Sequence, residues 1–277
     1  MEGREDLKIL ILYYSGTGNT KFACEVARLV MEKAGHEVTM KTYAKAGKEP
    51  IDGYDLYCFA APVYEWAPAK NVERFVTSMA RLPGKRAFVI TSSAGATGQA
   101  IPLFARMLEG KGLTLLGNYN LICPDSWGGT RRWSYSQDAE TPTAESVREL
   151  AEFTGNMLEA AEELEQGRAV DLPDYEVKPT GLFFASRASR LAPSSRFKMG
   201  KKKVDTKECT ECDVCAKNCP SGAITLDPYP RFGGQCIACW RCVNTCPADC
   251  ITTLIDSGHH YKGIVDKDSL LKQAGLK

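Results

Sequence analysis

Histidine and long apolar runs are scarce in this 277-residue sequence, and their scarcity excludes several classes of protein. The three histidines, His36, His259 and His260, form no metal-ligand or nucleophile–base pattern, and we expect them on the surface. No apolar run approaches the roughly 18 residues that a membrane-spanning helix needs. Lysine and arginine number 35 against 34 aspartate and glutamate residues. A net charge of +1 gives no reason to expect binding to nucleic acid or insertion into a membrane.

The first residues lack the features of a secretion signal. Within residues 1–16, an acidic and polar start precedes a short apolar run, and neither a basic region nor a small-residue cleavage site is present. Apolar residues make up 44% of the sequence and charged residues 25%, which is an ordinary balance for a globular protein and excludes wholesale disorder. We therefore expect a folded, cytoplasmic protein.

Cysteine is scarce in the first two hundred residues and abundant after them. Of the twelve cysteines, nine lie between Cys209 and Cys250, and only Cys24, Cys58 and Cys123 precede them. A secreted disulfide scaffold would spread its cysteines through a short chain. The uneven distribution indicates two regions with different chemistry. The three early cysteines are predicted to be buried thiols of a hydrophobic core.

Strand-like and helix-like segments alternate over the first 166 residues. The run at 7–14 is continuously apolar, as in a strand that is buried on both faces of a parallel sheet. The alternation predicts an α/β domain with a doubly wound, parallel, five-stranded sheet. The predicted strands are 7–14, 36–43, 54–61, 86–93 and 113–123, and the predicted helices are 19–34, 69–80, 98–110 and 143–166.

A proline-containing, basic segment follows at about 167–203. The simpler interpretation is a solvated linker with a short helix near 181–192, and the alternative is a basic docking face for an acidic redox partner. We expect separate domains at 1–166 and 204–277 on either side of this linker. Its basic residues are Arg187, Arg190, Arg196, Lys198, Lys201, Lys202 and Lys203.

The C-terminal region contains an internal repeat. Residues 209–224 return as residues 236–251, and each copy reads Cys-x2-Cys-x2-Cys-x3-Cys-Pro. Three closely spaced thiolates hold three corners of a 4Fe–4S cluster, and in two-cluster proteins the fourth cysteine ligates the other cluster. The spacing predicts one cluster on Cys209, Cys212, Cys215 and Cys246, and a second on Cys236, Cys239, Cys242 and Cys219.

Structural zinc is the alternative for these cysteines. Zinc sites usually pair two Cys-x2-Cys knuckles, whereas each copy here has a third close cysteine and a Cys-Pro ending. Cys250 aligns with Ala223 of the first copy, which favours a small apolar filler beside a cluster over an exchangeable ligand. Residues 205–265 resemble the bacterial two-cluster ferredoxin family, which implies a small α+β domain.

A glycine-rich loop joins the first predicted strand to the first predicted helix. Ser15–Thr20 reads SGTGNT and offers N–H and hydroxyl donors at a helix start, where phosphate groups bind. The loop lacks the G-x-x-x-x-G-K-S/T pattern of nucleotide triphosphatases, and Lys21 replaces the third glycine of the dinucleotide fingerprint. A single phosphate monoester fits better, and FMN carries one.

Two further loops follow predicted strands at the same edge of the sheet. Residues 61–69 offer Tyr64 and Trp66, and residues 91–100 offer small side chains with free backbone donors. Ligands of open α/β sheets bind at the carboxyl ends of the strands, where the strand order reverses. Because apolar aromatic walls hold planar rings, we expect at least one of the two aromatic side chains to contact a flavin, although packing between domains is the alternative.

Residues 7–123 resemble flavodoxin, and the whole chain resembles the flavodoxin–ferredoxin fusion proteins often called EFR1-type ferredoxins. Cys24 and Ala27 depart from the family's loop–helix signature, which usually has Ala and then Leu or Ile at these positions. The resemblance implies that the FMN phosphate binds to Ser15, Thr17, Gly18, Asn19 and Thr20. It also implies that the isoalloxazine ring lies between Pro62, Val63, Tyr64, Glu65 and Trp66 on one side and Ser92, Ser93, Ala94 and Gly95 on the other.

The predicted connection at 124–142 is longer than a usual strand-to-helix loop and holds Trp127, Arg131, Arg132, Trp133 and Tyr135. Long loops in compact domains often carry function. Three interpretations compete: a lid over FMN, a surface that packs on the second domain, and the wall of a substrate site. We favour packing between the domains.

Two 4Fe–4S clusters and FMN on one chain predict an electron-transfer protein. FMN holds one or two electrons and each cluster passes one, so the chain would relay electrons between a low-potential donor and an acceptor in a reducing, anaerobic cell. The alternative is an FMN-dependent reductase of a small molecule that is fed by the clusters. A redox sensor would need an effector region, which this sequence does not suggest. We expect redox protein partners and leave a homodimer open.

Overall fold

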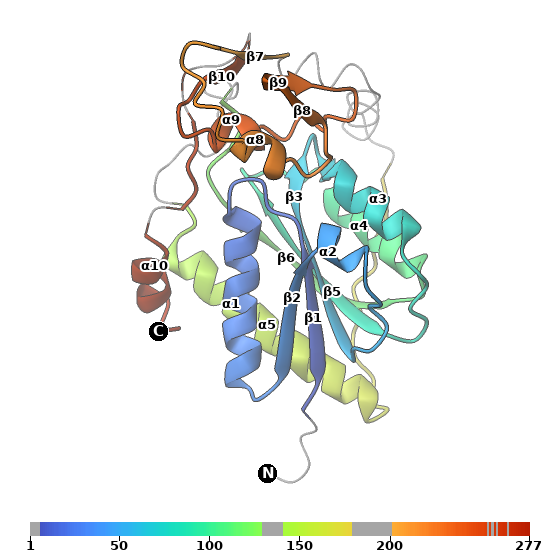
Figure 1. Cartoon of the computed structure of the whole chain (residues 1–277). Coiled ribbons are helices and arrows are strands. Elements are labelled where there is room, and N and C mark those ends of the chain that lie inside the picture. The colour runs from blue at the N-terminus through green and yellow to red at the C-terminus, as the bar shows by residue number, and fades with distance from the viewer. Residues whose placement is uncertain are drawn as a thin grey trace.

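The computed structural model describes residues 6–128, 141–178, 201–253, 255, 258, 260–264 and 266–277. A large domain built around a sheet carries a small cysteine-rich domain at one end (Figure 1). The predicted helix near 181–192 and most of the predicted loop at 124–142 lie outside the described residues. None of the helices in the described part is long and apolar enough to cross a membrane.

A parallel sheet with strand order β2-β1-β3-β5-β6 forms the centre of the large domain. This confirms the predicted flavodoxin-like, five-stranded sheet, with a switch point between β1 and β3. The bounds lie within three residues of those predicted from apolar runs. The strands are β1 (Lys8–Tyr13), β2 (Glu37–Thr42), β3 (Leu56–Tyr64), β5 (Arg86–Ser93) and β6 (Thr114–Ile122).

A short strand, β4 (Ala67–Pro68), pairs antiparallel with the end of β3 and was not predicted. The two residues between these strands, Glu65 and Trp66, have φ values of 51° and 59°. Two consecutive left-handed residues match the twist of a tight hairpin, but sequence reasoning expects glycine or asparagine there. The hairpin therefore carried no recognisable turn signal.

Helices cover both faces of the sheet (Figure 1). Alternate residues of each strand face opposite sides, so Ile9 and Ile11 join one hydrophobic core while Leu10 and Leu12 join the other. Cys24, Cys58 and Cys123 are buried in the first core, as predicted. The helices are α1 (Asn19–Lys33) and α5 (Ala144–Glu165) on the first side, and α2 (Tyr43–Ala46), α3 (Lys70–Ser78) and α4 (Ala100–Glu109) on the second.

The small domain has the α+β character that the repeat predicts. Two antiparallel strand pairs and two one-turn helices surround a core that includes Trp240, Val243 and Ile251. The elements are β7 (Lys202–Val204), α8 (Val214–Lys217), β8 (Ile224–Asp227), β9 (Tyr229–Phe232), α9 (Arg241–Asn244) and β10 (Ile251–Thr253).

The chain crosses between the domains more than once. Helix α10 (Lys267–Gln273), which the sequence division placed in the second domain, packs Leu271 into the core beneath α1 and α5. The described part of the predicted linker also lies on the large domain. Tyr175 is buried in the second core, and the Lys178 N–H donates to Gln99 Oε1 at 3.0 Å.

The predicted surface position of the histidines is wrong for His36, which is 5% exposed. It follows the left-handed turn at Gly35 between α1 and β2, and its Nδ1 accepts a hydrogen bond from the Leu7 N–H at 3.3 Å. The ring thus satisfies a backbone donor at the start of β1. The side chain of His260 is only 9% exposed and pairs with Asp249, while His259 lies outside the described residues.

Candidate functional site

The loops at the carboxyl ends of the strands meet at the edge of the sheet that faces the small domain (Figure 1). The first of them is the glycine-rich loop Ser15–Gly18, after which α1 begins at Asn19. Gly18 has a φ of 105°, carries no side chain to cap the helix, and leaves the backbone N–H groups of the first turn without a capping partner. Because an uncapped helix N-terminus attracts anions, this loop fits the phosphate of FMN.

The side chains of the predicted phosphate residues are engaged in protein contacts. Thr20 Oγ1 and Ser92 Oγ lie 2.7 Å apart, which ties the glycine-rich loop to the end of β5. The Asn19 side chain accepts a hydrogen bond from the Tyr261 hydroxyl at 2.7 Å and donates to Pro124 O at 3.4 Å. The Gly18 N–H donates to Ser15 Oγ at 3.0 Å. Backbone N–H groups are therefore the main donors that this loop offers to a phosphate.

The residues predicted to hold the flavin ring converge on the same edge, where aromatic side chains fill the space between the loops. A Cβ atom on Gly16 would lie 2.5 Å from the Tyr64 hydroxyl oxygen, and one on Gly98 would lie 2.5 Å from Trp66 Cβ. Gly98, with a φ of 55°, has to be glycine, whereas a side chain at Gly16 would displace the Tyr64 hydroxyl. A planar ring between these loops requires Tyr64 and Trp66 to move outward from these contacts.

The small residues expected on the other side of the ring lie at the end of β5 and just beyond it. Ser93 Oγ accepts hydrogen bonds from the side chain of Asn120 at 3.0 Å and from the Gly95 N–H at 3.3 Å. Ser92 and Ser93 are buried, and Ala94 and Gly95 are partly exposed. Pro62 and Val63 belong to the last part of β3, and Glu65 lies in the following turn.

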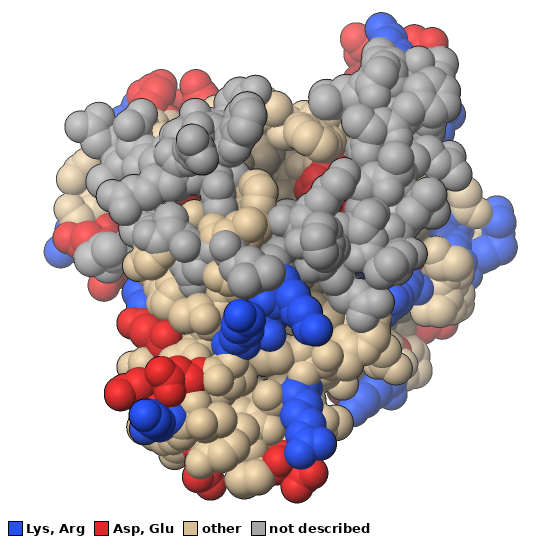
Figure 2. Space-filling model, turned by 90° about the horizontal axis from the view of Figure 1, so that it is seen from above, with Lys and Arg blue, Asp and Glu red and all other residues tan. Residues whose placement is uncertain are grey.

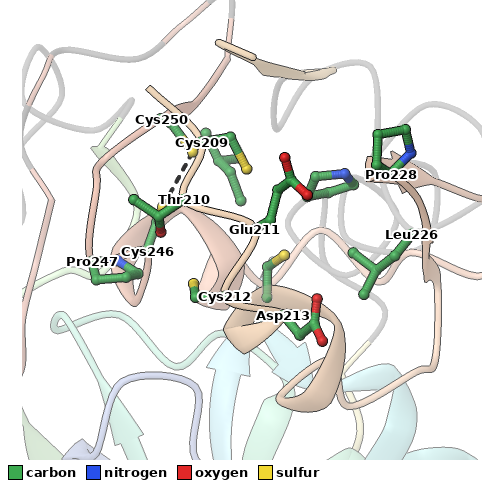
Figure 3. A pocket seen from close by; sticks show the side chains of 13 residues that line it. Cys209, Thr210, Glu211, Cys212, Asp213, Leu226, Pro228, Cys246, Pro247 and Cys250 are labelled. Atoms are coloured by element: carbon green, nitrogen blue, oxygen red, sulfur yellow. Dashed lines mark hydrogen bonds between the residues drawn. The ribbon is translucent and has the colours of Figure 1, made fainter. Parts of the chain in front are cut away.

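Four of the repeat cysteines, together with Cys250, line one pocket of the small domain (Figure 3). They are the set predicted for the first cluster: Cys209, Cys212, Cys215 and Cys246. Cys212 is exposed, while Cys246 is buried and its sulfur lies 3.5 Å from that of Cys250. In the described ranges, no three Cys, His, Asp or Glu side chains are close enough to hold a single metal ion. The pocket thus places these thiols around a shared space, as a multi-atom cluster requires.

The cysteines of the second predicted set also lie together. Burial raises the pKa of Cys242, and neighbouring negative charges on Cys239, Cys236 and Cys219 raise it further. The Ala223 N–H donates to Cys219 Sγ at 3.3 Å, and the Ala238 N–H donates to Cys236 Sγ at 3.4 Å. Backbone N–H groups directed at sulfur stabilise a negatively charged cluster.

The two motifs share an unusual backbone. Glu211 and Asp213 in the first copy have φ values of 51° and 62°, and their equivalents Ala238 and Trp240 have values of 56° and 55°. Left-handed residues at the same two places let each loop wrap around a sulfur-lined space, and the use of non-glycine residues at all four of these positions indicates that both loops meet the same geometric demand. The assignment of each cysteine to a cluster stays a prediction.

The second motif contacts the glycine-rich loop directly. Arg241, between Cys239 and Cys242, donates from Nη1 to the Ser15 carbonyl oxygen at 2.5 Å. Tyr261 reaches Asn19, as described above, and Asn244 donates to Ser126 O at 2.6 Å. Sequence reasoning missed these residues, although the repeat contained a signal. The positions equivalent to Arg241 and Asn244 in the first copy are Val214 and Lys217.

Tyr14, the last residue before the glycine-rich loop, also lies between the two sites. Its hydroxyl is buried, with the sulfur of Cys239 and the hydroxyl of Tyr64 as its polar neighbours. Burial raises its pKa well above the usual value, and negative charge on Cys239 raises it further. The second set of cysteines is therefore adjacent to the residues predicted to bind FMN.

The described start of the long loop packs between the domains. Trp127 contacts the hydrophobic core of the small domain, and Ser126 accepts the hydrogen bond from Asn244. These contacts agree with the interpretation that we favoured for the loop. Residues 129–140, which include Arg131, Arg132, Trp133 and Tyr135, lie outside the described residues.

Comparison with known proteins assigns both regions. Residues 10–111 match a family described as a flavodoxin domain, and residues 202–225 match a family described as a 4Fe–4S binding domain. The second match includes only the first cysteine motif. No curated protein matched the chain.

Solved structures similar to the large domain are distant in sequence. A flavodoxin from the domain Archaea is 16% identical, with a TM-score of 0.43, over 56% of this chain and 99% of that chain. The two-electron reduced flavodoxin of Megasphaera elsdenii is 21% identical, with a TM-score of 0.39, over 56% and 98%. The rubredoxin oxygen:oxidoreductase of Desulfovibrio gigas is 15% identical, with a TM-score of 0.46, over 56% and 36%.

The strand order, the glycine-rich loop and the two domain matches agree with one another. The EFR1 subtype stays a prediction. Residues 10–111 match a flavodoxin domain and residues 202–225 match a 4Fe–4S binding domain in the same polypeptide, which supports a flavodoxin–ferredoxin fusion with an electron-transfer role.

Proposed function

We propose that this protein relays electrons between an external redox protein and FMN through two 4Fe–4S clusters. The outer cluster would be held by the pocket cysteines of Figure 3, and the inner cluster by Cys236, Cys239, Cys242 and Cys219. When bound, FMN supplies the change between one-electron and two-electron chemistry. The protein residues set the distances, the electrostatics and the access of partners.

The contact of Arg241 with Ser15 is the observation that carries the proposal. Arg241 lies between Cys239 and Cys242, two predicted ligands of the inner cluster. Its hydrogen bond therefore connects this cysteine loop with the predicted phosphate loop. Tyr14 adds a second connection, because its ring lies beside both Tyr64 and Cys239. Electrons that reach the inner cluster would therefore be next to the flavin.

Access from outside favours entry or exit at the outer cluster. Cys212 is exposed, and the exposed Glu211 lies beside it on the pocket rim. Figure 2 shows both signs of charge on the described part of the end that carries the small domain. This face supports a protein partner but does not indicate a partner of one charge sign. The direction of electron flow depends on the potentials of the donor and the acceptor.

A small-molecule reductase needs an open, substrate-sized space above the ring, with polar groups placed to bind the substrate. The contact of Arg241 with Ser15 instead connects the second set of cysteines with the predicted flavin site, which favours the relay. The electron relay is therefore the function that we propose, and no observation favours the reductase over it.

The relay is tested by oxygen-free purification with flavin, iron and sulfide quantified, followed by rapid-mixing measurement of flavin reduction through the clusters. In the same assay, Thr17→Val with Thr20→Val should lower FMN affinity by roughly tenfold or more, because the double variant removes the Thr17 hydroxyl and breaks the contact of Thr20 with Ser92 that ties the phosphate loop to β5. Thr77→Val, an exposed residue of α3, serves as the control. A preparation with clusters but without flavin, or a flavin that the clusters do not reduce, would refute the relay.

A further inference from the structure

Arg241 is a half-buried arginine without a matching carboxylate among the described residues. Its Nε is buried and has no hydrogen-bond partner, and its one hydrogen bond goes from Nη1 to the Ser15 carbonyl oxygen. Among the described residues, no carboxylate forms an ion pair with it. A buried N–H donor without an acceptor is costly, so a further acceptor, and for a cation one that carries negative charge, is expected beside Nε.

The loop that Arg241 touches has no positive charge of its own. Ser15–Thr20 contains only neutral residues, and Lys21, which follows, pairs with Glu25 at 3.3 Å. A phosphate on this loop would be held by backbone donors and the helix dipole alone. Guanidinium groups bind phosphate through several N–H donors at once, so the free donors of Arg241 are suited to this ligand.

Two other assignments fit the contacts less well. Lys262 lies in a pocket beside Thr17, but its Nζ already pairs with Asp249 at 2.6 Å. The charge of the inner cluster is a competing partner for Arg241, yet Lys202 is the basic side chain with a contact to its sulfur ligands, 3.8 Å from Cys236 Sγ. Arg241 directs its hydrogen bond toward the flavodoxin domain.

The internal repeat also favours a phosphate partner for Arg241. The residue equivalent to Arg241 in the first motif is Val214, so the fold around a cluster does not itself need a cation at this position. The first motif borders the exposed pocket, and the second borders the phosphate loop. The arginine is present only in the copy that faces the predicted flavin site.

We propose that Arg241 of the 4Fe–4S domain is a phosphate-binding residue of the FMN site, so that the flavin is bound by both domains. This inference rests on the proposed function, because it requires FMN at the glycine-rich loop. It makes Arg241 a specificity-determining residue that selects FMN over riboflavin, which has the same ring without the phosphate. It also ties the inner cluster loop to the bound phosphate.

The test is a competition between FMN and riboflavin on the full chain with its clusters loaded and its flavin removed under mild, oxygen-free conditions. The protein is incubated with an equimolar excess of both flavins, and the bound flavins are released and separated by chromatography. Iron and sulfide are measured in each sample. The variants are Arg241→Gln, Arg241→Lys and, as a neighbouring basic control, Lys262→Gln.

Arg241→Gln should lower the FMN-to-riboflavin ratio by about tenfold or more, because it removes a charge-assisted contact to the phosphate. Arg241→Lys should retain part of the preference, and Lys262→Gln should retain nearly all of it. Because the ratio compares two ligands in one preparation, general loosening of the domains affects both and cancels.

An unchanged ratio in Arg241→Gln would overturn the inference, including the case in which both flavins bind more weakly by the same factor. An equal fall in Lys262→Gln would overturn it too, since the effect would then be a general one of charge. A wild-type protein that binds neither flavin would refute the proposed function itself. If the wild-type protein binds FMN and the Arg241→Gln variant has the same FMN-to-riboflavin ratio, only the role of Arg241 is refuted.

Discussion

The two cysteine motifs of this chain have the same spacing and the same backbone turns, but they lie in different surroundings. Cys212 in the first motif is exposed and borders a pocket, whereas the equivalent Cys239 in the second is only partly exposed and its neighbour Trp240 is 1% exposed. The residues between the cysteines differ accordingly. Asp213, Val214 and Lys217 of the first motif correspond to Trp240, Arg241 and Asn244 of the second.

This comparison separates two demands on the same sequence pattern. The cysteines and the left-handed turns are shared, as we expect if each loop surrounds a cluster of the same shape. The intervening residues differ because one loop faces solvent and the other faces a second domain. Under the proposed relay, the variable positions of the repeat would distinguish a copy for electron entry from a copy for transfer to the flavin.

The largest expected effect comes from removing the fourth cysteine of each motif. If the ligands cross between motifs, Cys246→Ser removes the outer cluster and Cys219→Ser removes the inner one, and each variant loses about half of its iron. A bulky chelator should then strip the remaining cluster quickly from Cys219→Ser and slowly from Cys246→Ser, because Cys212 of the outer set is the one exposed cysteine of the two sets.

Iron content and the rate of chelation measure this difference. Cys24→Ala, which replaces a buried thiol of the flavodoxin core, is the matched control and should keep both clusters. The reverse order of chelation would show that each motif ligates its own fourth cysteine.

A smaller effect is expected from the polar contacts that only the second motif makes. Asn244 is fully buried, donates to Ser126 O and accepts from the Tyr261 N–H at 3.1 Å. Asn244→Ala leaves both backbone groups unpaired and should lower the free energy of unfolding by about 2–4 kcal/mol. Lys217→Ala, at the equivalent exposed position, should change it by less than about 0.5 kcal/mol.

Denaturant unfolding of the cluster-loaded proteins compares these two variants. Similar losses in both would mean that the motifs are equivalent in their contribution to stability and that the interface contacts of Asn244 contribute little.

The smallest effect concerns the buried hydroxyl of Tyr14, beside Cys239. In the loaded protein we expect it to donate to the sulfur, which stabilises the more negative, reduced cluster. Tyr14→Phe should lower the reduction potential of the inner cluster by about 40 mV, if the bond contributes about 1 kcal/mol. Tyr43→Phe removes another buried hydroxyl, but one that lies beside Cys58, and should leave both potentials unchanged.

Potentiometric titration followed by cluster absorbance measures the shift. Equal shifts in the two variants would assign the effect to general packing rather than to a bond with Cys239.

Sequence patterns predicted the sheet well because its strands are continuous apolar runs. The predicted strand at 86–93 coincides with β5, and α5 differs from its prediction by one residue at each end. The β4 hairpin was missed because its turn uses Glu65 and Trp66 in a conformation that normally favours glycine. The exposure of His36 was predicted wrongly because its ring is buried where it accepts a hydrogen bond from the Leu7 N–H, a contact that the local sequence does not indicate.

The candidate site divides in the same way. The glycine-rich loop and the cysteine sets were visible in the sequence, because phosphate and iron–sulfur clusters each require particular residue types at short, fixed spacings. Arg241 and Tyr261 were not, because their partners lie more than two hundred residues earlier in the chain. No local pattern reports such a contact.

The sequence by itself therefore determined the cofactor chemistry and the two folds that carry it, since both depend on local spacing and periodicity. Only the tertiary structure decided that the second motif faces the phosphate loop, that the first motif faces solvent, and that α10 packs back onto the flavodoxin domain. These features arise from burial and hydrogen bonding between distant segments, and they depend on how the two domains dock.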